Sequence, residues 1–133
     1  MISLRKVPLS GDDLTDWHFK EIVALLRKNN VLVERRKRVM DPDRWRRRAL
    51  RGLMQPGIGS GGHGIKITIS SAKRMNPNRD AEVVTLIHEA SHAIRGKPWE
   101  YRIRGLESIL ARRFTKKQKD FIKKHFLPRH ETK

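Results

Sequence analysis

Apolar residues recur at helical spacing near the start of the chain. Between Asp12 and Asn29 they lie three or four positions apart, at Leu14, Trp17, Ile22, Leu25 and Leu26. This period places them on one face of a helix that packs against a core. Asp12 or Asp13 is suited to the start of that helix, because a short acidic side chain accepts from the free backbone amides of the first turn. The pattern predicts a helix over 12–29.

Strict alternation of apolar and polar residues marks the segment Gly64–Ser70. Alternation is typical of a half-buried strand. Val31–Val33 predicts the start of another short strand, which extends toward Val39. Two strands are few for a sheet, so we expect a further one near Ser3–Val7 or Arg35–Met40.

The segment between these strands has the pattern of an arginine-rich helix. Asp41 and Pro42 favour a helix start, since proline is well tolerated at the first helical position. We therefore predict a helix over 42–54, with Trp45, Ala49, Leu50, Leu53 and Met54 facing inward. The glycine-rich stretch Pro56–Gly64 then predicts a loop.

A second, largely apolar helix is predicted around Val83–Ile94. Asn78 or Asp80 is suited to cap it, and Gly96 to end it. A return helix over Trp99–Phe114 would fold back on it after a short turn.

The last part of the chain predicts one more helix. Thr115 would cap it, and it would extend to about Phe126, with Phe121 and Ile122 in its apolar stripe. Residues Pro128–Lys133 are expected to fray.

The predicted helix at Val83–Ile94 contains the sequence His88-Glu89-Ala-Ser-His92, an HExxH motif. Histidines four residues apart share one face of a helix and can bind one metal ion. Glu89 lies next to the first of them and can reach a water molecule on that metal. The alternative is a structural cluster of polar side chains, but burying such groups without partners is costly. The motif predicts a catalytic Zn²⁺ site with Glu89 as its general base.

A catalytic zinc ion takes three protein ligands and one water molecule, so a third ligand is needed. The metal should lie level with the midpoint of His88 and His92, and the matching level on the return helix is near residue 104. Glu100 and Glu107 bracket that level and share a helix face. Glu107 is slightly nearer to it and is the preferred third ligand.

Other residues are weaker candidates for this site. The remaining histidines considered as metal ligands are His18, His63, His125 and His130. The side chains considered as donors to a developing oxyanion are His63, Tyr101 and Arg104, which the sequence does not rank.

With these residues the chain resembles zincin metallopeptidases of the gluzincin type, including the small minigluzincins and the ImmA/IrrE-like peptidases. The resemblance covers roughly Gly64–Phe114. It implies that His88, His92 and Glu107 bind zinc and that Glu89 activates water to hydrolyse a peptide bond. It also implies that Gly64–Ser70 is the edge strand that lines the cleft and pairs with an extended protein or peptide substrate.

Length and composition favour one cytoplasmic domain over residues 1–133. The chain has no cysteine, which excludes disulfides and thiolate zinc sites. Its first twenty residues lack the apolar core of a signal peptide, and it has no apolar run long enough to cross a membrane. Together with the patterns above, this predicts a small α+β, zincin-like domain: a few-stranded sheet packed on the HExxH helix, with additional helices.

Charge is the other informative feature. Lys and Arg number 31 against 14 acidic residues, a net charge of +17. Basic residues concentrate in Arg35–Arg51 and Arg112–Lys133, and such a field attracts nucleic acids or acidic partners. Trp45 lies among arginines, as a stacking residue or as part of the core. The alternative function is therefore a nucleic-acid-associated basic binding protein with a structural or vestigial zinc site.

Overall fold

The computed structural model describes residues 7–42, 48–58, 60–95 and 112–132, together with Gly105 and Ile109. Within these residues the chain forms three α-helices and one three-stranded sheet. In chain order the elements are α1 (Asp13–Leu26), β1 (Val31–Arg36), β2 (Gly52–Ile58), a 3-10 turn η2 (Ser60–Gly62), β3 (Gly64–Ser70), α2 (Arg79–Arg95) and α4 (Lys116–Phe126).

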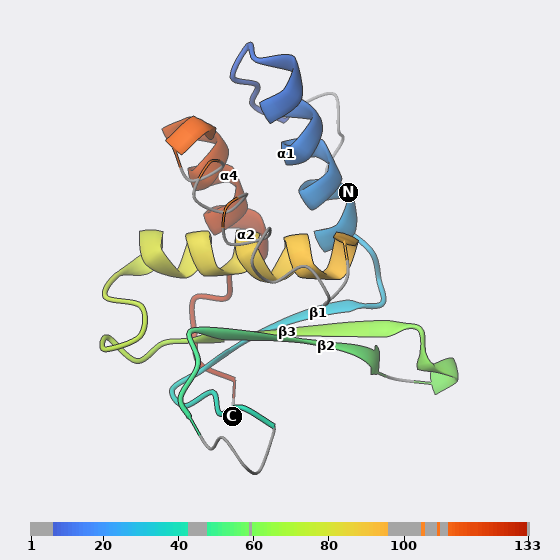
Figure 1. Cartoon of the computed structure of the whole chain (residues 1–133), viewed down its shortest axis with the longest axis vertical. Coiled ribbons are helices and arrows are strands. Elements are labelled where there is room, and N and C mark those ends of the chain that lie inside the picture. Colours follow the sequence, from blue (N-terminus) through green and yellow to red (C-terminus); the bar gives the residue numbers. More distant parts are fainter. Residues whose placement is uncertain are drawn as a thin grey trace.

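The elements form layers, with α2 between the sheet and the other helices. Figure 1 shows α2 lying across one face of the sheet, and α1 and α4 packing on α2 from the side away from the strands. The described part of the chain is therefore a mixed α/β domain in which one face of the sheet is covered by helix. The predicted fold class is confirmed at this level.

The sheet has the strand order β1-β3-β2, with β1 parallel and β2 antiparallel to β3. Gly52 pairs with Ile69, and Ile69 in turn pairs with Arg35, so these three residues lie on the same face. A Cβ at Gly52 would touch Thr85 and Glu89, which identifies this as the face toward α2. The most deeply buried strand residues, Ile67 and Ile69, lie on it and form the core with α2.

Helix α1 confirms the first predicted helix, and Asp12 caps it by accepting from the Thr15 amide at 3.0 Å. The predicted inward face was partly wrong, because the side chains of Leu14 and Trp17 are 55% and 53% exposed. The core instead takes a neighbouring apolar stripe, formed by Phe19, Ile22, Val23 and Leu26. The helix carries two overlapping stripes, and packing against α2 and α4 selects the one with Phe19.

The third strand is not where the sequence placed it. The helix predicted over 42–54 is wrong from Arg48 onward, because Ala49 bridges Met40 and Gly52–Ile58 form β2. The predicted loop at Pro56–Gly64 is wrong in its first part for the same reason. Glycine disfavours a helix interior, and Pro56 lies on an edge strand, where a missing amide is tolerated.

Strand β3 confirms the predicted strand, but its predicted place in the sheet is wrong. Gly64–Ser70 form the central strand, with neighbours on both sides. The edge strands are β1 and β2, and β2 is the one beside the residues of the HExxH motif. The added pairing with β2, which the sequence pattern did not reveal, moves β3 to the centre.

Helix α4 confirms the last predicted helix and its cap. The Thr115 hydroxyl accepts from the Gln118 amide at 3.1 Å, while the Gln118 side chain accepts from the Thr115 amide at 3.0 Å. This reciprocal capping box satisfies two backbone donors that a helix start leaves free. None of the described helices is long and apolar enough to cross a lipid bilayer.

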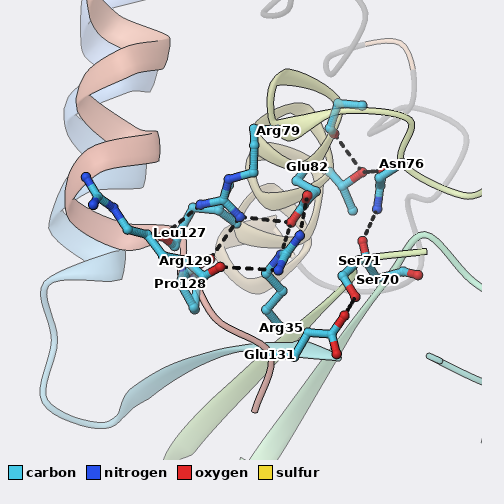
Figure 2. Close-up of polar contacts among 12 residues, drawn as sticks. Arg35, Ser70, Ser71, Asn76, Arg79, Glu82, Leu127, Pro128, Arg129 and Glu131 are labelled. Carbon is cyan, nitrogen blue, oxygen red and sulfur yellow. Dashed lines mark hydrogen bonds and ion pairs between the residues drawn. The ribbon is translucent and has the colours of Figure 1, made fainter. Parts of the chain in front are cut away.

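The segment Pro128–Lys133 was expected to fray, but hydrogen bonds hold its described residues, 128–132. The Thr132 amide donates to the Arg35 carbonyl at 2.6 Å, and the Ser71 hydroxyl donates to Glu131 at 2.6 Å. Arg79 donates to the Pro128 carbonyl at 2.9 Å. Figure 2 shows the contacts of Arg79 with Pro128 and of Ser71 with Glu131. Together these bonds hold the C-terminal segment against β1, the residue after β3 and the start of α2.

Candidate metal centre

The three residues of the motif lie in the second half of helix α2. The helix begins after Asn78, whose side chain accepts from the Ala81 amide at 2.8 Å, as predicted for the cap. Its apolar residues Leu86, Ile87 and Ala90 are buried in the core. Burial of this stripe fixes the rotation of the helix about its axis, and that rotation directs the remaining face, with His88, Glu89 and His92, toward β2.

These three side chains form one compact cluster. The Nε2 atoms of His88 and His92 lie 3.1 Å apart, and the His88 Nε2 lies 3.9 Å from a Glu89 carboxylate oxygen. All three residues are buried, with at most 7% of their surface exposed. In the described part of the chain, this is the only group of three or more histidine and acidic residues close enough together to hold a metal ion.

The geometry of the histidine pair can be tested against a zinc ion. Two nitrogens bound to one zinc at about 2.0–2.1 Å, with a tetrahedral angle between them, lie roughly 3.3 Å apart. The observed separation of 3.1 Å differs from this by a few tenths of an ångström. Without a metal, the same separation allows one ring to donate a hydrogen bond to the other. The donor set, two imidazoles on one helix face, thus fits zinc with little rearrangement.

The cluster lines a cavity of about 340 Å³ between β2 and α2. Helix α2 contributes one wall, and β2 with the segment before it contributes the other. Besides the cluster itself, the lining residues include Asp41, Arg48, Arg51, Gly52 and Thr85. The cavity gives a ligand access to side chains that are otherwise buried.

Glycine at position 52 allows β2 to approach the motif closely. A Cβ at this position would lie 2.6 Å from Thr85 Cγ2 and 3.1 Å from Glu89 Cγ. Real Cβ atoms do not approach other atoms to 2.6 Å, so any larger residue must displace Thr85, Glu89 or the strand. Gly52 therefore sets the position of Glu89 against the cavity wall.

A buried asparagine joins the three elements around the cavity. The Asn76 side-chain amide donates to the carbonyls of Arg51 at 3.0 Å and Ser70 at 2.8 Å. Its oxygen accepts from the Thr85 hydroxyl at 2.7 Å. Asn76 thereby fixes the start of β2, the end of β3 and the middle of α2 relative to one another.

A second polar network anchors the first turn of α2 (Figure 2). Glu82 is almost fully buried and receives two hydrogen bonds from Arg35, at 2.6 and 3.2 Å, and one from Arg79 at 3.2 Å. The hydrogen bond to Glu82 raises the pKa of the Arg35 guanidinium, although burial acts in the opposite direction. Since Arg35 also donates to the Arg129 carbonyl, the network links α2, β1 and the C-terminal segment.

The structure brings His88, Glu89 and His92 together. Glu107, Glu100, Tyr101 and Arg104 lie outside the described residues. Of the described positions of the predicted return helix, Gly105, Ile109, Arg112 and Arg113 are helical, and Phe114 lies in a bend after them.

The remaining histidines do not belong to the cluster. His63 is exposed, and its carbonyl accepts from Asn30. His18 contacts Trp17, and His125 contacts Phe121. His130 is exposed near the end of the chain.

Sequence reasoning missed two residues that shape the site. Gly52 lay inside a predicted helix, where a glycine costs about 1 kcal/mol relative to alanine, and that cost was the available signal. Asn76 carried no signal, because its three partners are brought together by the fold.

No family model, curated protein or solved structure matches this chain. The resemblance to gluzincins therefore depends on the residues of the motif and on the predicted downstream glutamate.

Proposed function

We propose that this chain is a zinc-dependent peptidase of the gluzincin type. The observation that carries the proposal is the burial of His88, His92 and Glu89 in one cavity, with the two histidine Nε2 atoms 3.1 Å apart. A structural zinc site is normally closed by four protein ligands, whereas a catalytic one keeps a position open. An accessible cavity beside two histidines and a glutamate favours the catalytic kind.

In this proposal His88 and His92 hold the zinc ion, and Glu107 or Glu100 supplies the third ligand. Bound zinc acts as a Lewis acid that lowers the pKa of water and polarises a carbonyl group. The Glu89 carboxylate accepts the proton of the attacking water molecule and then donates it to the leaving amine. Gly52, on the opposite wall, leaves room for the Glu89 side chain at this position.

The proposal is tested first by metal content. Protein purified without added zinc is expected to contain close to one zinc ion per chain, and His92→Ala is expected to contain far less. Glu107→Ala and Glu100→Ala, measured side by side, identify the third ligand as the variant that loses zinc. His63→Ala is the matched control, because this exposed histidine lies outside the cluster.

Hydrolysis then separates the enzyme from the alternative. Glu89→Gln is expected to keep its zinc and to lose about 10²–10⁴-fold in peptide hydrolysis, the usual contribution of a general base. A basic binding protein with a structural zinc site would bind zinc without hydrolysing any peptide. Wild-type protein that binds no zinc, even after reconstitution, would refute the peptidase and leave the basic surface as the guide to function.

A further inference from the structure

Exposed basic residues gather where the cavity opens. Arg48 and Arg51 are both exposed, and both line the cavity that contains Glu89. Arg51 immediately precedes Gly52, the residue against which Glu89 packs. The two arginines are therefore part of the same cavity as the candidate metal centre.

A hairpin brings another arginine to this place. The Leu50 amide donates to the Val39 carbonyl at 2.8 Å, and Met40 bridges Ala49 in antiparallel orientation. Arg38 lies two residues before Met40, and Arg51 lies two residues after Ala49. Arg38 is exposed as well.

A turn adds two more basic residues. Lys73 and Arg74 are exposed in the turn after β3, which also contains Asn76. Because Asn76 donates to the Arg51 carbonyl, this turn is held beside the start of β2. We call the five residues Arg38, Arg48, Arg51, Lys73 and Arg74 the basic collar.

Among the described residues that line the cavity, the acidic ones are Asp41 and Glu89. Asp41 lies 3.4 Å from the Arg48 guanidinium, and the side chains of Arg48 and Asp41 are 58% and 14% exposed. The five charges of the collar outnumber these two carboxylates. A cluster of like charges around a concave site raises the local concentration of ligands of opposite charge.

We propose that the ligand of this cavity is an acidic polypeptide segment. Its scissile peptide bond would lie in the cavity beside Glu89, and the basic collar would hold Asp or Glu residues on either side of that bond. This inference rests on the proposed function for the hydrolytic step, but the binding preference is measured separately. Electrostatic complementarity of this kind mainly raises the association rate and the specificity, and it weakens with salt.

A peptide fits these observations better than a nucleic acid. Proteins that hold single-stranded nucleic acid combine basic residues with aromatic platforms on which bases stack. The described residues that line the cavity include no aromatic side chain besides the two histidines of the cluster. Two collar residues, Arg48 and Arg51, line the cavity beside Glu89, where an extended chain can present a backbone carbonyl.

The experiment measures binding of two matched peptides to zinc-loaded Glu89→Gln by fluorescence anisotropy. One peptide carries Asp and Glu on both sides of its central bond, and its twin carries Asn and Gln. We expect the acidic peptide to bind about tenfold more tightly at low salt, with the difference shrinking at high salt.

Two double variants locate the effect. Arg38→Gln with Arg74→Gln removes two collar charges from residues that do not line the cavity. It is expected to weaken acidic-peptide binding about fivefold, without changing binding of the neutral twin. Lys116→Gln with Lys117→Gln removes the same charge from exposed positions on α4 and is expected to change binding less than about twofold.

Several results would overturn the inference. Equal affinity for the two peptides would refute the preference, and an equal loss in both double variants would assign it to the net charge rather than to the collar. A single-stranded oligonucleotide that displaces the acidic peptide at matched charge and lower concentration would assign the collar to nucleic acid. If wild-type, zinc-loaded protein cleaves neither peptide but the binding preference holds, the proposed function fails and this inference stands.

Discussion

At the scale of single residues, the candidate centre depends on the close approach of β2 to α2 at Gly52, where there is no room for a side chain. Gly52 lies where a Cβ would meet Thr85 and Glu89, so the strand and the helix of the motif are as close as backbone and side chain permit. The position of the Glu89 side chain therefore depends on Gly52, a residue that has no side chain.

Gly52→Ala tests this dependence. We expect it to destabilise the protein by about 1–3 kcal/mol, because overpacking a tight contact displaces its neighbours. The free energy of unfolding in urea gives the measurement. The matched control is Gly105→Ala, where an added Cβ meets nothing within 4 Å. A Gly52→Ala protein as stable as the control would contradict the close approach.

At the scale of elements, polar networks fix how β1, α2 and the C-terminal segment meet. Glu82 receives hydrogen bonds from Arg35 and Arg79, and both arginines also bind carbonyls in the segment after α4. These bonds explain why a segment of polar residues, expected to fray, follows one path. They also fix the first turn of the helix that carries the motif.

Glu82→Gln tests the network between these elements. Removing one partner of a buried ion pair costs about 3–5 kcal/mol, because it leaves the other charge buried and uncompensated. The side chains of Glu82 and Arg35 are only 3% and 17% exposed. Unfolding in urea is expected to show a loss toward the lower end of that range.

The control for this variant is Asp80→Asn, two positions before Glu82 on the same helix. Asp80 pairs with Lys123 at 2.8 Å, but its side chain is 76% exposed, so we expect a loss of about 0–1 kcal/mol. Similar losses in the two variants would show that the buried network contributes no more to the free energy of unfolding than an exposed ion pair does.

At the scale of the whole molecule, Asp16 joins parts of the chain that are far apart in sequence. Its carboxylate accepts from the Ser10 amide at 2.8 Å and from the Gln118 side chain at 2.9 Å. Burial raises the pKa of Asp16, but hydrogen bonds from Ser10, Gly11 and Gln118 outweigh it, so the net pKa lies below the ordinary value.

This shift predicts a pH dependence with a definite sign. A carboxyl group whose pKa is lower in the folded state binds fewer protons there than in the unfolded chain. Its contribution to stability is present above the unfolded pKa of 3.8 and is lost as the pH falls through the lower folded pKa. Urea unfolding at pH 6 and pH 3 is expected to show a smaller acid-induced loss in Asp16→Asn than in wild type. An equal loss would exclude Asp16 as a source of acid sensitivity.

The sequence by itself determined the local elements and the candidate chemistry. Three helices, the cap at Thr115, the choice of Asp12 or Asp13 for the first cap, and the strand Gly64–Ser70 followed from periodicity and capping residues, which act within a few positions along the chain. The motif His88, Glu89 and His92 was visible because a helix brings residues four apart to one face.

Only the tertiary structure decided which neighbours these elements acquire. Strand β2 forms where a helix was predicted, because pairing with β3 outweighs the weak local preference of that segment. That pairing makes β3 central and brings Gly52 to Glu89 and Asn76 to Arg51. It also brings Arg51 to the cavity beside Glu89, and the turn with Lys73 and Arg74 to the start of β2. These contacts join residues far apart along the chain, so neither periodicity nor spacing carries information about them.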